Sequence, residues 1–428
     1  MTTRTEHTGS YYADSRNDTL DRPTLNDKVE TDICIIGAGF TGISSALHLA
    51  EAGFKVVVLE AARIGFGASG RNGGQLVNSY SRDIDVIEKN YGQDLGKALG
   101  NMAFEGADII RQRIKKYNID CNYQAGGIFA AITNRQLHEL KQQQQLWQRY
   151  GHDDLHLLDK NEIGEHIASE RYVGGLLDNR GGHIHPLNLL LGEVKAFETL
   201  GGKVYEDSAA IRIERQPQPI VHTANGQVKA KYLLIAGNAY MANLVPELAA
   251  KSMPCGTQII TTEVLDESIA NSLIPGGQCV EDCNYKLDYY RLTQDHRLLY
   301  GGGVTYGGGD PASIERFIRN HLEQTFPQLK GVKFDYAWGG DFLLTMSRLP
   351  QFGRLTDHIY YAQGYSGHGV TTTHLAGKLI AEAIGGHAQR FDAFASLKHF
   401  PFPGGRLFRV PYTMMGAVYY GLRDKLGI

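Results

Sequence analysis

Three glycines between a short apolar run and a helical pattern constrain the fold of this chain more than any other feature. Residues 33–36 are apolar and mostly β-branched, as expected of a strand buried on both faces. Gly37, Gly39 and Gly42 follow with the spacing G-x-G-x-x-G, ahead of apolar residues at helical intervals. Residues 55–59 then predict a second strand. Strand, glycine turn, helix and strand together make the βαβ unit that binds dinucleotides.

Each part of this unit has a physical role in holding a pyrophosphate. Gly37 allows the tight turn, Gly39 lets the backbone approach the phosphates, and Gly42 lets helix and strand pack closely. The helix N-terminus offers free N–H groups and the positive end of its dipole. Glu60 lies eighteen residues after Gly42, where a carboxylate accepts hydrogen bonds from a ribose and repels a 2′-phosphate. The motif leaves both NAD and FAD open as the ligand.

The overall composition excludes several classes of partner. A chain of 428 residues exceeds what one core usually supports, so two joined domains are expected. The net charge of −3 and a pI of about 6.6 predict no basic surface for nucleic acid. No apolar run approaches the roughly 18 residues of a membrane span, and the N-terminus lacks the apolar core of a signal peptide. We therefore expect a cytoplasmic protein.

The cysteines indicate neither a disulfide framework nor a metal site. The chain has five of them, scattered from Cys34 to Cys283, which is too few for a disulfide-stapled protein of this size. Cys279 and Cys283 are four apart, but no second Cys or His pair lies nearby at a zinc spacing. We expect five reduced thiols and no bound metal.

Two further glycine-rich segments favour a flavin over NAD. Residues 359–384 repeat the opening pattern, with a strand ending near Gln363, a glycine loop, and a helix from about Val370. A second helix N-terminus suits the negative charge of a reduced flavin. Residues 65–79, "GFGASGRNGGQLVNS", contain five glycines and come directly after Glu60. We interpret them as a loop laid along an extended FAD rather than as a flexible surface loop.

The texture of the chain predicts an α/β fold with a discontinuous, Rossmann-like FAD-binding domain. Asn225–Gly226 marks a hairpin between two central strands, whereas residues 253–338 read as strands rich in Thr, Tyr and Gly. The predicted parts are a lightly docked N-terminal arm (1–27), the FAD-binding domain (28–105, 170–252 and 339–395), a substrate-binding domain of mostly antiparallel β-sheet plus helices (106–169 and 253–338), and a C-terminal helical tail (396–428). We expect the tail to dock on protein rather than on a membrane surface.

These motifs together resemble the FAD-dependent amine oxidases related to D-amino acid, glycine and sarcosine oxidases. The resemblance spans residues 30–395 and rests on the first glycine motif with Glu60 and on the segments "GASGRNGGQ", "LLIAGNAY", "GGDFLLTMSRLPQFG" and "YSGHGVTTTHLAGKLIAE". Within the family, "RIGFGASGRNGGQLVNSYSRDIDVIEK", "GGHIHPLNL", "SMPCGTQ" and "VEDCNY" resemble members that act on gamma-glutamylated polyamines.

The resemblance implies an oxidoreductase of polyamine catabolism. Its substrate would be gamma-glutamylputrescine, whose free CH–NH2 group passes a hydride to flavin N5. The imine would hydrolyse to an aldehyde and ammonia, and O2 would reoxidise the flavin to give H2O2. Two alternatives remain: an amine or D-amino-acid dehydrogenase that reduces a quinone, and a non-catalytic nucleotide-binding protein. The residues leave the oligomeric state open.

The resemblance also implies which residues hold the cofactor. The expected contacts are Gly37, Ala38, Gly39, Thr41 and Gly42 at the pyrophosphate, Glu60 at the ribose, Ala210 at the adenine, Ala68, Ser69, Arg71, Asn72, Gly73, Gly74 and Gln75 along the ribityl chain and flavin, and Gly364, Tyr365, Gly367, His368, Gly369 and Val370 at the pyrimidine side of the flavin. Some relatives tether FAD through a His where this chain has Arg71, or through a Cys that "GGDFLLTMSRLP" lacks. Noncovalent FAD is therefore expected.

The residues that contact the substrate are less well defined than those at the cofactor, because each candidate could also have a purely structural role. By resemblance, Arg291 could bind a carboxylate bidentately, or it could form an ordinary salt bridge. Strand alternation places Tyr289 on the same face as Arg291 and Tyr290 on the other. His185 could line the cavity or position the amine. His368 could polarise the flavin or stabilise its own loop.

Overall fold

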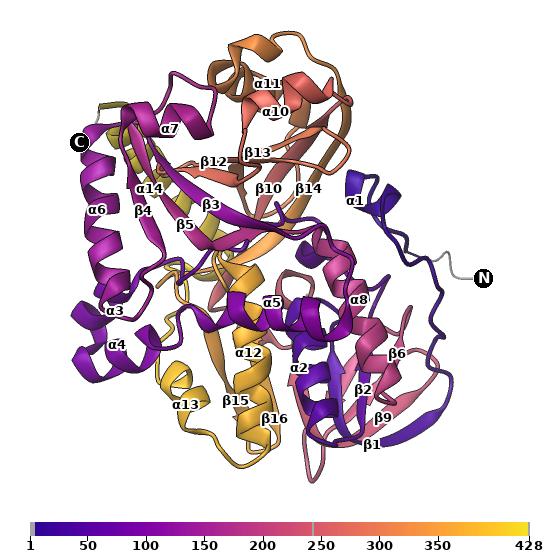
Figure 1. Ribbon diagram of the computed structural model, residues 1–428. Coiled ribbons are helices and arrows are strands. Elements are labelled where there is room, and N and C mark those ends of the chain that lie inside the picture. The colour runs from indigo at the N-terminus through magenta and orange to yellow at the C-terminus, as the bar shows by residue number, and fades with distance from the viewer. Residues whose placement is uncertain (1–4, 242–243, 427–428) are drawn as a thin grey trace.

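The computed structural model describes residues 5–241 and 244–426, which form two eight-stranded sheets with helices around them. One sheet lies in the lower part of Figure 1 and the other in the upper part. The chain passes between them several times, so each sheet is assembled from distant segments.

The first sheet is the predicted dinucleotide-binding sheet. Its order is β15-β16-β9-β1-β2-β6, with β8 beside β9 and β7 beside β8. Its strands are β1 (Lys28–Ile36), β2 (Val56–Leu59), β6 (Lys203–Tyr205), β7 (Arg212–Glu214), β8 (Ile220–His222), β9 (Gln227–Ile235), β15 (Gln351–Thr356) and β16 (Ile359–Gln363). β1 pairs in parallel with β2 and β9, and β8 pairs antiparallel with β9 across the turn at Asn225–Gly226. The βαβ unit and the hairpin are therefore confirmed.

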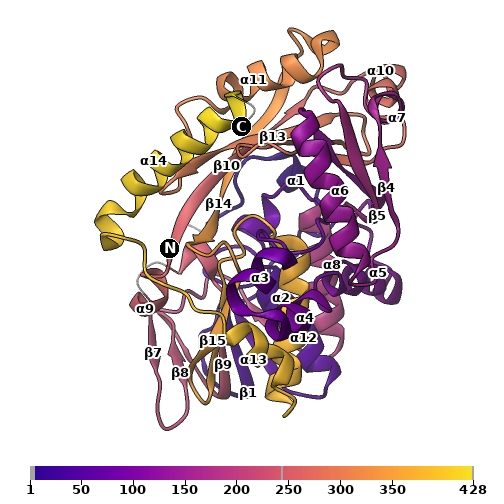
Figure 2. The ribbon, with the colours of Figure 1, turned by 90° about the vertical axis from the view of Figure 1, so that its left-hand side faces the viewer.

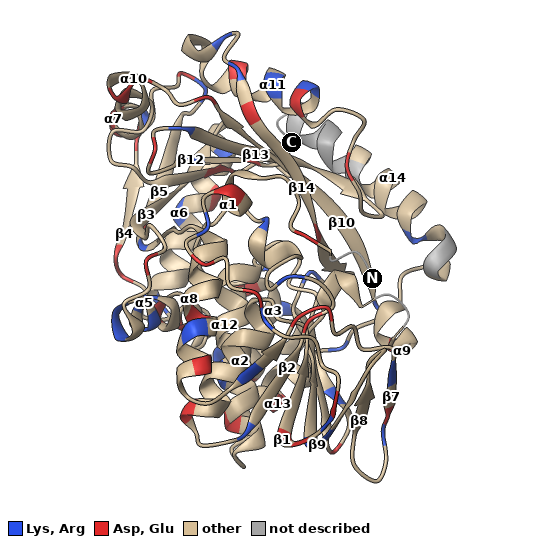
Figure 3. Ribbon diagram, turned by 90° about the vertical axis from the view of Figure 1, so that its right-hand side faces the viewer, with Lys and Arg blue, Asp and Glu red and all other residues tan. Residues whose placement is uncertain are grey.

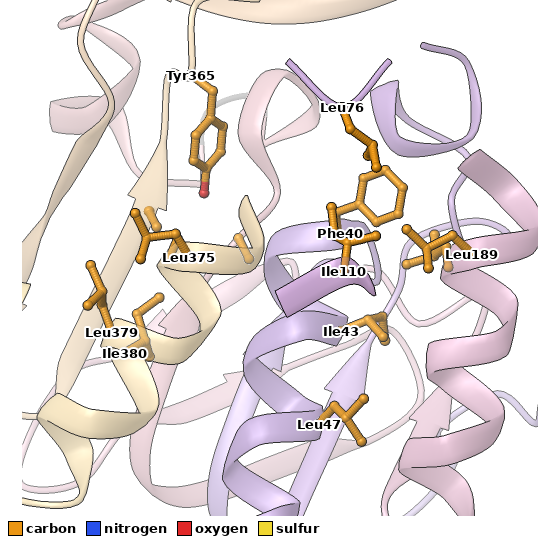
Figure 4. Close-up of a cluster of buried hydrophobic side chains, with 14 of the residues drawn as sticks. Phe40, Ile43, Leu47, Leu76, Ile110, Leu189, Tyr365, Leu375, Leu379 and Ile380 are labelled. Carbon is orange, nitrogen blue, oxygen red and sulfur yellow. The ribbon is translucent and has the colours of Figure 1, made fainter. Parts of the chain in front are cut away.

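Helices cover one face of this sheet and bury an apolar layer. They are α2 (Phe40–Glu51), α5 (Glu105–Tyr117), α8 (Pro186–Thr199) and α12 (Gly369–Ile384). α2 lies against α8 and α12, and α12 also contacts α5. Figure 4 shows the apolar side chains that fill this layer, among them Phe40, Ile43, Leu47, Ile110, Leu189, Leu375, Leu379 and Ile380. Because α2 and α12 are packed side by side, their N-termini are held in fixed positions.

The second sheet is antiparallel apart from one parallel pair, β11 with β3. Its order is β14-β10-β13-β12-β11-β3-β5-β4. Its strands are β3 (Gln124–Ala131), β4 (Leu155–Leu158), β5 (Gly174–His183), β10 (Ser252–Thr262), β11 (Cys279–Asp282), β12 (Asp288–Leu292), β13 (Leu298–Tyr306) and β14 (Phe334–Thr345). The face of β12 that carries Tyr290 packs on a separate core, where its ring stacks on Tyr300 at 5.3 Å.

The remaining helices are shorter or lie at the margins of the two sheets. They are α3 (Ile84–Tyr91), α4 (Gln93–Gly100), α6 (Asn134–Gln148), α7 (Lys160–His166), α9 (Pro246–Ala249), α10 (Glu267–Leu273), α11 (Ile314–Thr325) and α13 (Gln389–Ala395). On the face in Figure 3, basic and acidic side chains are interspersed. No helix among the described residues combines the length and apolarity that crossing a bilayer requires.

The chain passes from one sheet to the other at residues that differ from the domain boundaries predicted from the sequence. The sequence predicts that residues 170–252 belong to the FAD-binding domain, but β5 pairs with β3 and β4 in the second sheet. β14 continues to Thr345 in the same sheet, although residues from 339 onward were assigned to the first domain. Strand pairing is a long-range property, so local composition does not reveal which sheet a strand joins.

The N-terminal arm is anchored by a few buried residues, which differs from the light docking that we predict, although most of its other described residues are exposed or half-buried. Residues 11–14 form a one-turn helix, α1 (Tyr11–Asp14), between α8 and the second sheet. Tyr12 is wholly buried, with its ring 4.9 Å from His185 and 5.3 Å from Trp338. Two consecutive tyrosines in a polar segment can anchor it, because each buries a large apolar ring.

The C-terminal tail forms a long helix, α14 (Gly405–Leu426), along the outer side of the second sheet (Figure 2). Near its start, Arg409 donates hydrogen bonds from Nη1 to the carbonyl oxygens of Ala249 and Ser252, at 3.1 and 2.7 Å. Val410 packs against a small core that includes Met253. The first turns of α14 are thus attached to the protein itself.

Candidate functional site

The glycine turn after β1 makes an approach to α2 that side chains would block. Gly37 has φ +105°, and a Cβ on it would lie 2.9 Å from the carbonyl oxygen of Ala236. A Cβ on Gly42 would overlap the carbonyl oxygen of Gly37. Gly39 precedes the first residue of α2 and has no side chain to cap the helix, and the N–H of Phe40 donates to Ser69 Oγ at 2.9 Å. This is the geometry that an anion-binding helix start requires.

A first cavity of about 510 Å³ lies over this turn. Glu60 lies at its wall, where its carboxylate accepts hydrogen bonds from the backbone N–H of Ala38 at 2.8 Å and of Ala62 at 3.1 Å. Burial raises the pKa of Glu60, which the backbone donors partly offset. Ala210 and Leu244 contribute an apolar wall. The cavity thus combines a helix start, a buried carboxylate and an apolar surface, as a nucleotide site needs.

A second cavity of about 370 Å³ adjoins the first. Seven residues line both cavities, namely Ala68, Asn72, Phe342, Ser366, Gly367, Gly369 and Val370. The junction therefore lies at the start of α12 and at the short helical turn of residues 68–70. The outer walls of the second cavity come from β10, β11, β12, β13 and β14 of the second sheet, so the two sheets meet at this cavity.

Most of the residues predicted to hold the cofactor line these cavities. The first cavity is lined by Gly37, Gly39, Thr41, Glu60, Ser69, Ala210 and Tyr365, the second by Arg71, Gly73, Gln75 and His368, and both by Ala68, Asn72, Gly367, Gly369 and Val370. Four predicted residues lie outside both linings: Ala38, Gly42, Gly74 and Gly364. These four shape the backbone instead. Gly364, for example, has φ +73° and donates its N–H to Asn238 Oδ1 at 3.1 Å.

The loop between the cavities is held rigidly by its own side chains and by the second sheet. Asn72 Oδ1 accepts the N–H of Gly74 at 2.8 Å, and its Nδ2 donates back into the turn of residues 68–70. Trp338 Nε1 donates to the carbonyl oxygen of Arg71 at 3.0 Å. The Arg71 guanidinium lies 4.4 Å from the ring centroid of Phe66. Such a loop is preorganised for a ligand and is no flexible surface segment.

Arg291 does not line either cavity, so the structure does not support its predicted contact with a substrate carboxylate. Its Nε donates to the carbonyl oxygen of Gly73 at 2.9 Å, and its Nη2 donates to Tyr12 Oη at 3.1 Å. The side chain is buried behind the loop. Tyr289 does line the second cavity, and Tyr290 points to the opposite face, as alternation predicts. Arg291 therefore supports the loop from behind.

His185 also lies outside the cavity linings, so its predicted amine-positioning role is not supported either. Its Nδ1 accepts the N–H of Asn188 at 3.1 Å at the start of α8, and its Nε2 lies 3.1 Å from Ser15 Oγ. Burial, and then the charge of Arg291, lower the pKa of His185 to about 3. A neutral imidazole that caps a helix and holds the N-terminal arm is a structural group.

His368 is the one predicted substrate-side imidazole that lines the second cavity. It precedes the first residue of α12. Its Nδ1 is enclosed and has no hydrogen-bond partner among the described residues. Burial lowers the pKa of His368 to about 4, so the ring is neutral at pH 7. An enclosed nitrogen without a protein partner is open to a hydrogen bond from a bound molecule.

The cavity also contains charged residues that we did not predict, among them the half-buried Glu281. Burial, and then the charge of Asp282, raise the pKa of Glu281 to about 7. Arg82 and Arg348 line the same cavity, Arg82 on the exposed side. A signal for Glu281 was present in the sequence, since two consecutive acids, Glu281 and Asp282, end a short strand and must face polar surroundings on its two sides. The residues that surround Glu281 in the fold come from distant parts of the chain, so the sequence does not predict them.

The described residues contain no metal-like cluster and no cystine. All five cysteines are free, and none of them lines either of the two cavities. Within residues 5–241 and 244–426, no group of three or more His, Cys, Asp or Glu side chains could hold a metal ion.

Comparisons with known proteins agree with this geometry. Residues 32–383 match the model of a family described as FAD-dependent oxidoreductases. Gamma-glutamylputrescine oxidoreductase of Escherichia coli is 64% identical over 425 residues, which cover 99% of this chain and 100% of that protein. Among solved structures, glycine oxidase of Geobacillus kaustophilus superposes with a TM-score of 0.69 at 20% identity, over 83% of this chain and 95% of that one. L-proline dehydrogenase of P. horikoshii gives 0.72 at 20% identity, over 83% and 94%.

Proposed function

Because this chain belongs to the family of FAD-dependent oxidoreductases, we propose that it oxidises the free primary amine of gamma-glutamylputrescine. Oxidation with O2 and water would yield the aldehyde, ammonia and H2O2. The name of the Escherichia coli relative supports the substrate, and its similarity extends over the whole of both chains. The enzyme would act in putrescine breakdown.

One observation carries the proposal: the cavity over the glycine turn shares lining residues with a second cavity at the start of α12. The residues present fit FAD, since the glycine turn leaves room for a pyrophosphate and Glu60 faces the first cavity. When bound, FAD supplies the acceptor for the hydride of the C–H bond beside the amine. The free N–H groups at the start of α12 suit the charge of a reduced flavin.

The protein's own residues bind and orient the amine and exclude water. Tyr289 and Thr257 line the second cavity, with 3.2 Å between their hydroxyl oxygens. A cavity enclosed by two sheets shields the reacting carbon from bulk solvent. Arg82 and Arg348 are cations at the same cavity, and we assign the glutamyl carboxylate to them because Arg291 is engaged elsewhere.

We further propose that FAD is held without a covalent bond. The first-loop position at which some relatives carry a tethering His is Arg71, whose Nε donates to the carbonyl oxygen of Phe66 at 2.6 Å. Denaturation in acid followed by centrifugation tests this directly. The yellow colour should pass into the supernatant as free FAD. A yellow pellet would contradict the proposal.

The decisive experiment mixes the purified yellow protein with gamma-glutamylputrescine without oxygen and follows the oxidised flavin band. Bleaching is expected, followed by recovery in air with one H2O2 formed per substrate consumed. Matched controls are putrescine, which lacks the glutamyl group, and gamma-glutamylbutylamine, which lacks the reacting amine. Bleaching without recovery in air would instead support a dehydrogenase. An unbleached band with gamma-glutamylputrescine would refute the substrate.

A further inference from the structure

Glu281 occupies a place in the second sheet where its carboxylate faces the second cavity. It lies on β11, between Val280 and Asp282. Val280 packs into the separate core on the far face, and Asp282 forms an ion pair with Arg171 at 3.0 Å. Because side chains alternate along a strand, Glu281 points to the opposite face, which lines the cavity.

The flavin-loop segment and the neighbouring strand fix this position. Gln75 Nε2 donates to the carbonyl oxygen of Val280 at 2.9 Å, which ties β11 to the loop between the two cavities. Directly across the ladder from Glu281 lies Tyr289, whose hydroxyl is engaged with Thr257. The carboxylate is therefore placed beside the predicted flavin loop by two elements that both line the cavity.

Within residues 5–241 and 244–426, Glu281 has no hydrogen bond and no ion pair, which is unusual for a carboxylate that is half-buried in a cavity. Carboxylates are rarely buried unless they are paired, because removing the charge from water is costly. The cations of the same cavity, Arg71, Arg82 and Arg348, do not pair with it. Its missing partner is then a cation that enters the cavity.

We propose that Glu281 binds the protonated terminal amine of the substrate and takes its proton before oxidation. The inference rests on the proposed function, because it assigns a role in recognising that amine. One N–H bond of the ammonium breaks, one O–H bond forms on the carboxyl group, and the electron pair of the broken bond stays on nitrogen. An ion pair becomes two neutral groups, and a poorly solvated cavity favours this exchange. The amine is left with the lone pair that its oxidation requires.

The acidity of the group agrees with this role. Burial raises the pKa of Glu281 to about 7, with a further contribution from the Asp282 carboxylate. A base is most effective when its pKa lies near the working pH. The other titratable or charged groups around it are Tyr289 on β12, Cys279 and Asp282 on β11, Asp178 on β5, Tyr285, Arg71, Arg82, Arg348 and His368.

The pH dependence of kcat/KM tests the proposal in the FAD-loaded enzyme. In the wild type, kcat/KM should fall below about pH 7 as Glu281 becomes protonated. E281Q should lower kcat/KM at pH 7 roughly 100-fold or more and abolish this acid limb. Its kcat/KM should instead rise tenfold per pH unit toward the pKa of a free alkylamine, about 10.4. E281D should keep an acid limb, but a weaker one at a shifted pH. E267Q, on the exposed helix α10, is the control and should match the wild type.

Binding provides a readout that is independent of turnover. The probes are gamma-glutamylbutylamine, with a neutral tail, and its analogue with a terminal trimethylammonium group, which cannot be oxidised to an imine. In calorimetry on the oxidised holoenzyme, E281Q should bind the cationic probe at least tenfold more weakly than the wild type and should bind the neutral probe equally well. Equal weakening of both probes would point to a general structural defect and overturn the assignment.

The outcomes separate this inference from the proposed function. If wild-type enzyme oxidises gamma-glutamylputrescine while E281Q keeps the wild-type pH profile, the role of Glu281 is refuted and the function stands. If wild-type enzyme does not oxidise that substrate, the proposed function itself has failed. Should E281Q not retain flavin, E281D decides: a weakened and shifted acid limb supports the role, and an unchanged profile overturns it.

Discussion

Arg291 donates a hydrogen bond from Nη2 to the hydroxyl of Tyr12 at 3.1 Å, which joins the N-terminal arm to the second sheet. The same guanidinium holds the carbonyl oxygen of Gly73 through Nε, and it lies 5.9 Å from the centroid of the Tyr12 ring. One buried cation thus connects the arm, strand β12 and the loop between the two cavities. The position of this loop therefore depends on the first residues of the chain.

We expect R291M to behave as a folding and cofactor-binding variant rather than as a substrate-binding variant. Loss of the guanidinium leaves the Gly73 carbonyl and the Tyr12 hydroxyl without this donor, which should lower the free energy of unfolding by about 2–4 kcal/mol. Affinity for FAD should fall, and KM of the remaining holoenzyme should change little. Urea unfolding, FAD titration and steady-state kinetics would measure the three effects.

The Y12F variant is the matched control, because it removes only the hydroxyl acceptor. Its unfolding free energy should fall by about 1 kcal/mol. If R291M kept wild-type stability and FAD affinity but raised KM a hundredfold, Arg291 would be a substrate ligand after all.

G42A should abolish FAD binding or prevent folding, since its Cβ would overlap the carbonyl oxygen of Gly37. The ratio of flavin to protein absorbance in the purified protein measures the effect. G164A in α7 is the control, because a Cβ there meets nothing within 4 Å. It should raise stability by about 0.5–1 kcal/mol and leave the flavin content unchanged. A yellow, stable G42A protein would show that the turn relaxes easily.

Sequence alone predicted the parts of this molecule in which function and local structure coincide. The turn at Gly37, Gly39 and Gly42 needs residues without side chains at fixed intervals, so its spacing is readable within one βαβ unit. The helix predicted from about Val370 begins at Gly369 for the same reason. Sixteen of the twenty residues predicted to hold the cofactor line at least one of the two cavities, and both glycine loops contribute to these linings.

The parts that failed depend on partners far away in the chain. Nothing near Tyr12 indicates that its hydroxyl meets Arg291, 279 residues later. The sequence around Arg291 indicates a carboxylate ligand, but in the fold its guanidinium donates to the carbonyl oxygen of Gly73. β5 lies in the segment that we assign to the FAD-binding domain, but its pairing with β3 in the second sheet is decided by tertiary contacts.

The stability of the protein should fall between pH 6.5 and pH 4, partly through His185. Burial and the charge of Arg291 lower the pKa of His185 from 6.5 to about 3. Between about pH 6.5 and pH 3, His185 is therefore protonated in the unfolded chain but neutral in the folded chain. The contribution of His185 to the free energy of unfolding is fully present above about pH 6.5. It is lost as pH falls toward 3, at up to ~1.4 kcal/mol per pH unit.

H185N isolates this contribution, because Asn caps helices well and does not titrate. Urea unfolding at saturating FAD should show a shallower loss of stability in H185N than in the wild type between pH 6 and 5, by about 1 kcal/mol. His183 and His368, whose pKa values are also lowered by burial, are present in both proteins and cancel in the comparison. Equal slopes would mean that His185 is solvated or charged in the folded protein.

Arg82 should contribute to binding the glutamyl carboxylate without contributing to the oxidation itself. It lies on the exposed side of the second cavity and, among the described residues, has no hydrogen bond or ion pair that would keep it from a ligand. An exposed charge pair of this kind is worth about 1 kcal/mol, so R82A should raise KM for gamma-glutamylputrescine roughly five- to tenfold and leave kcat unchanged. A substrate analogue without the carboxylate should be oxidised equally well by wild type and R82A.

K141A, on the exposed face of α6, controls for a general loss of positive charge. If R82A lowered kcat as well, or if both substrates responded equally, the carboxylate would bind elsewhere, with Arg348 as the next residue to test.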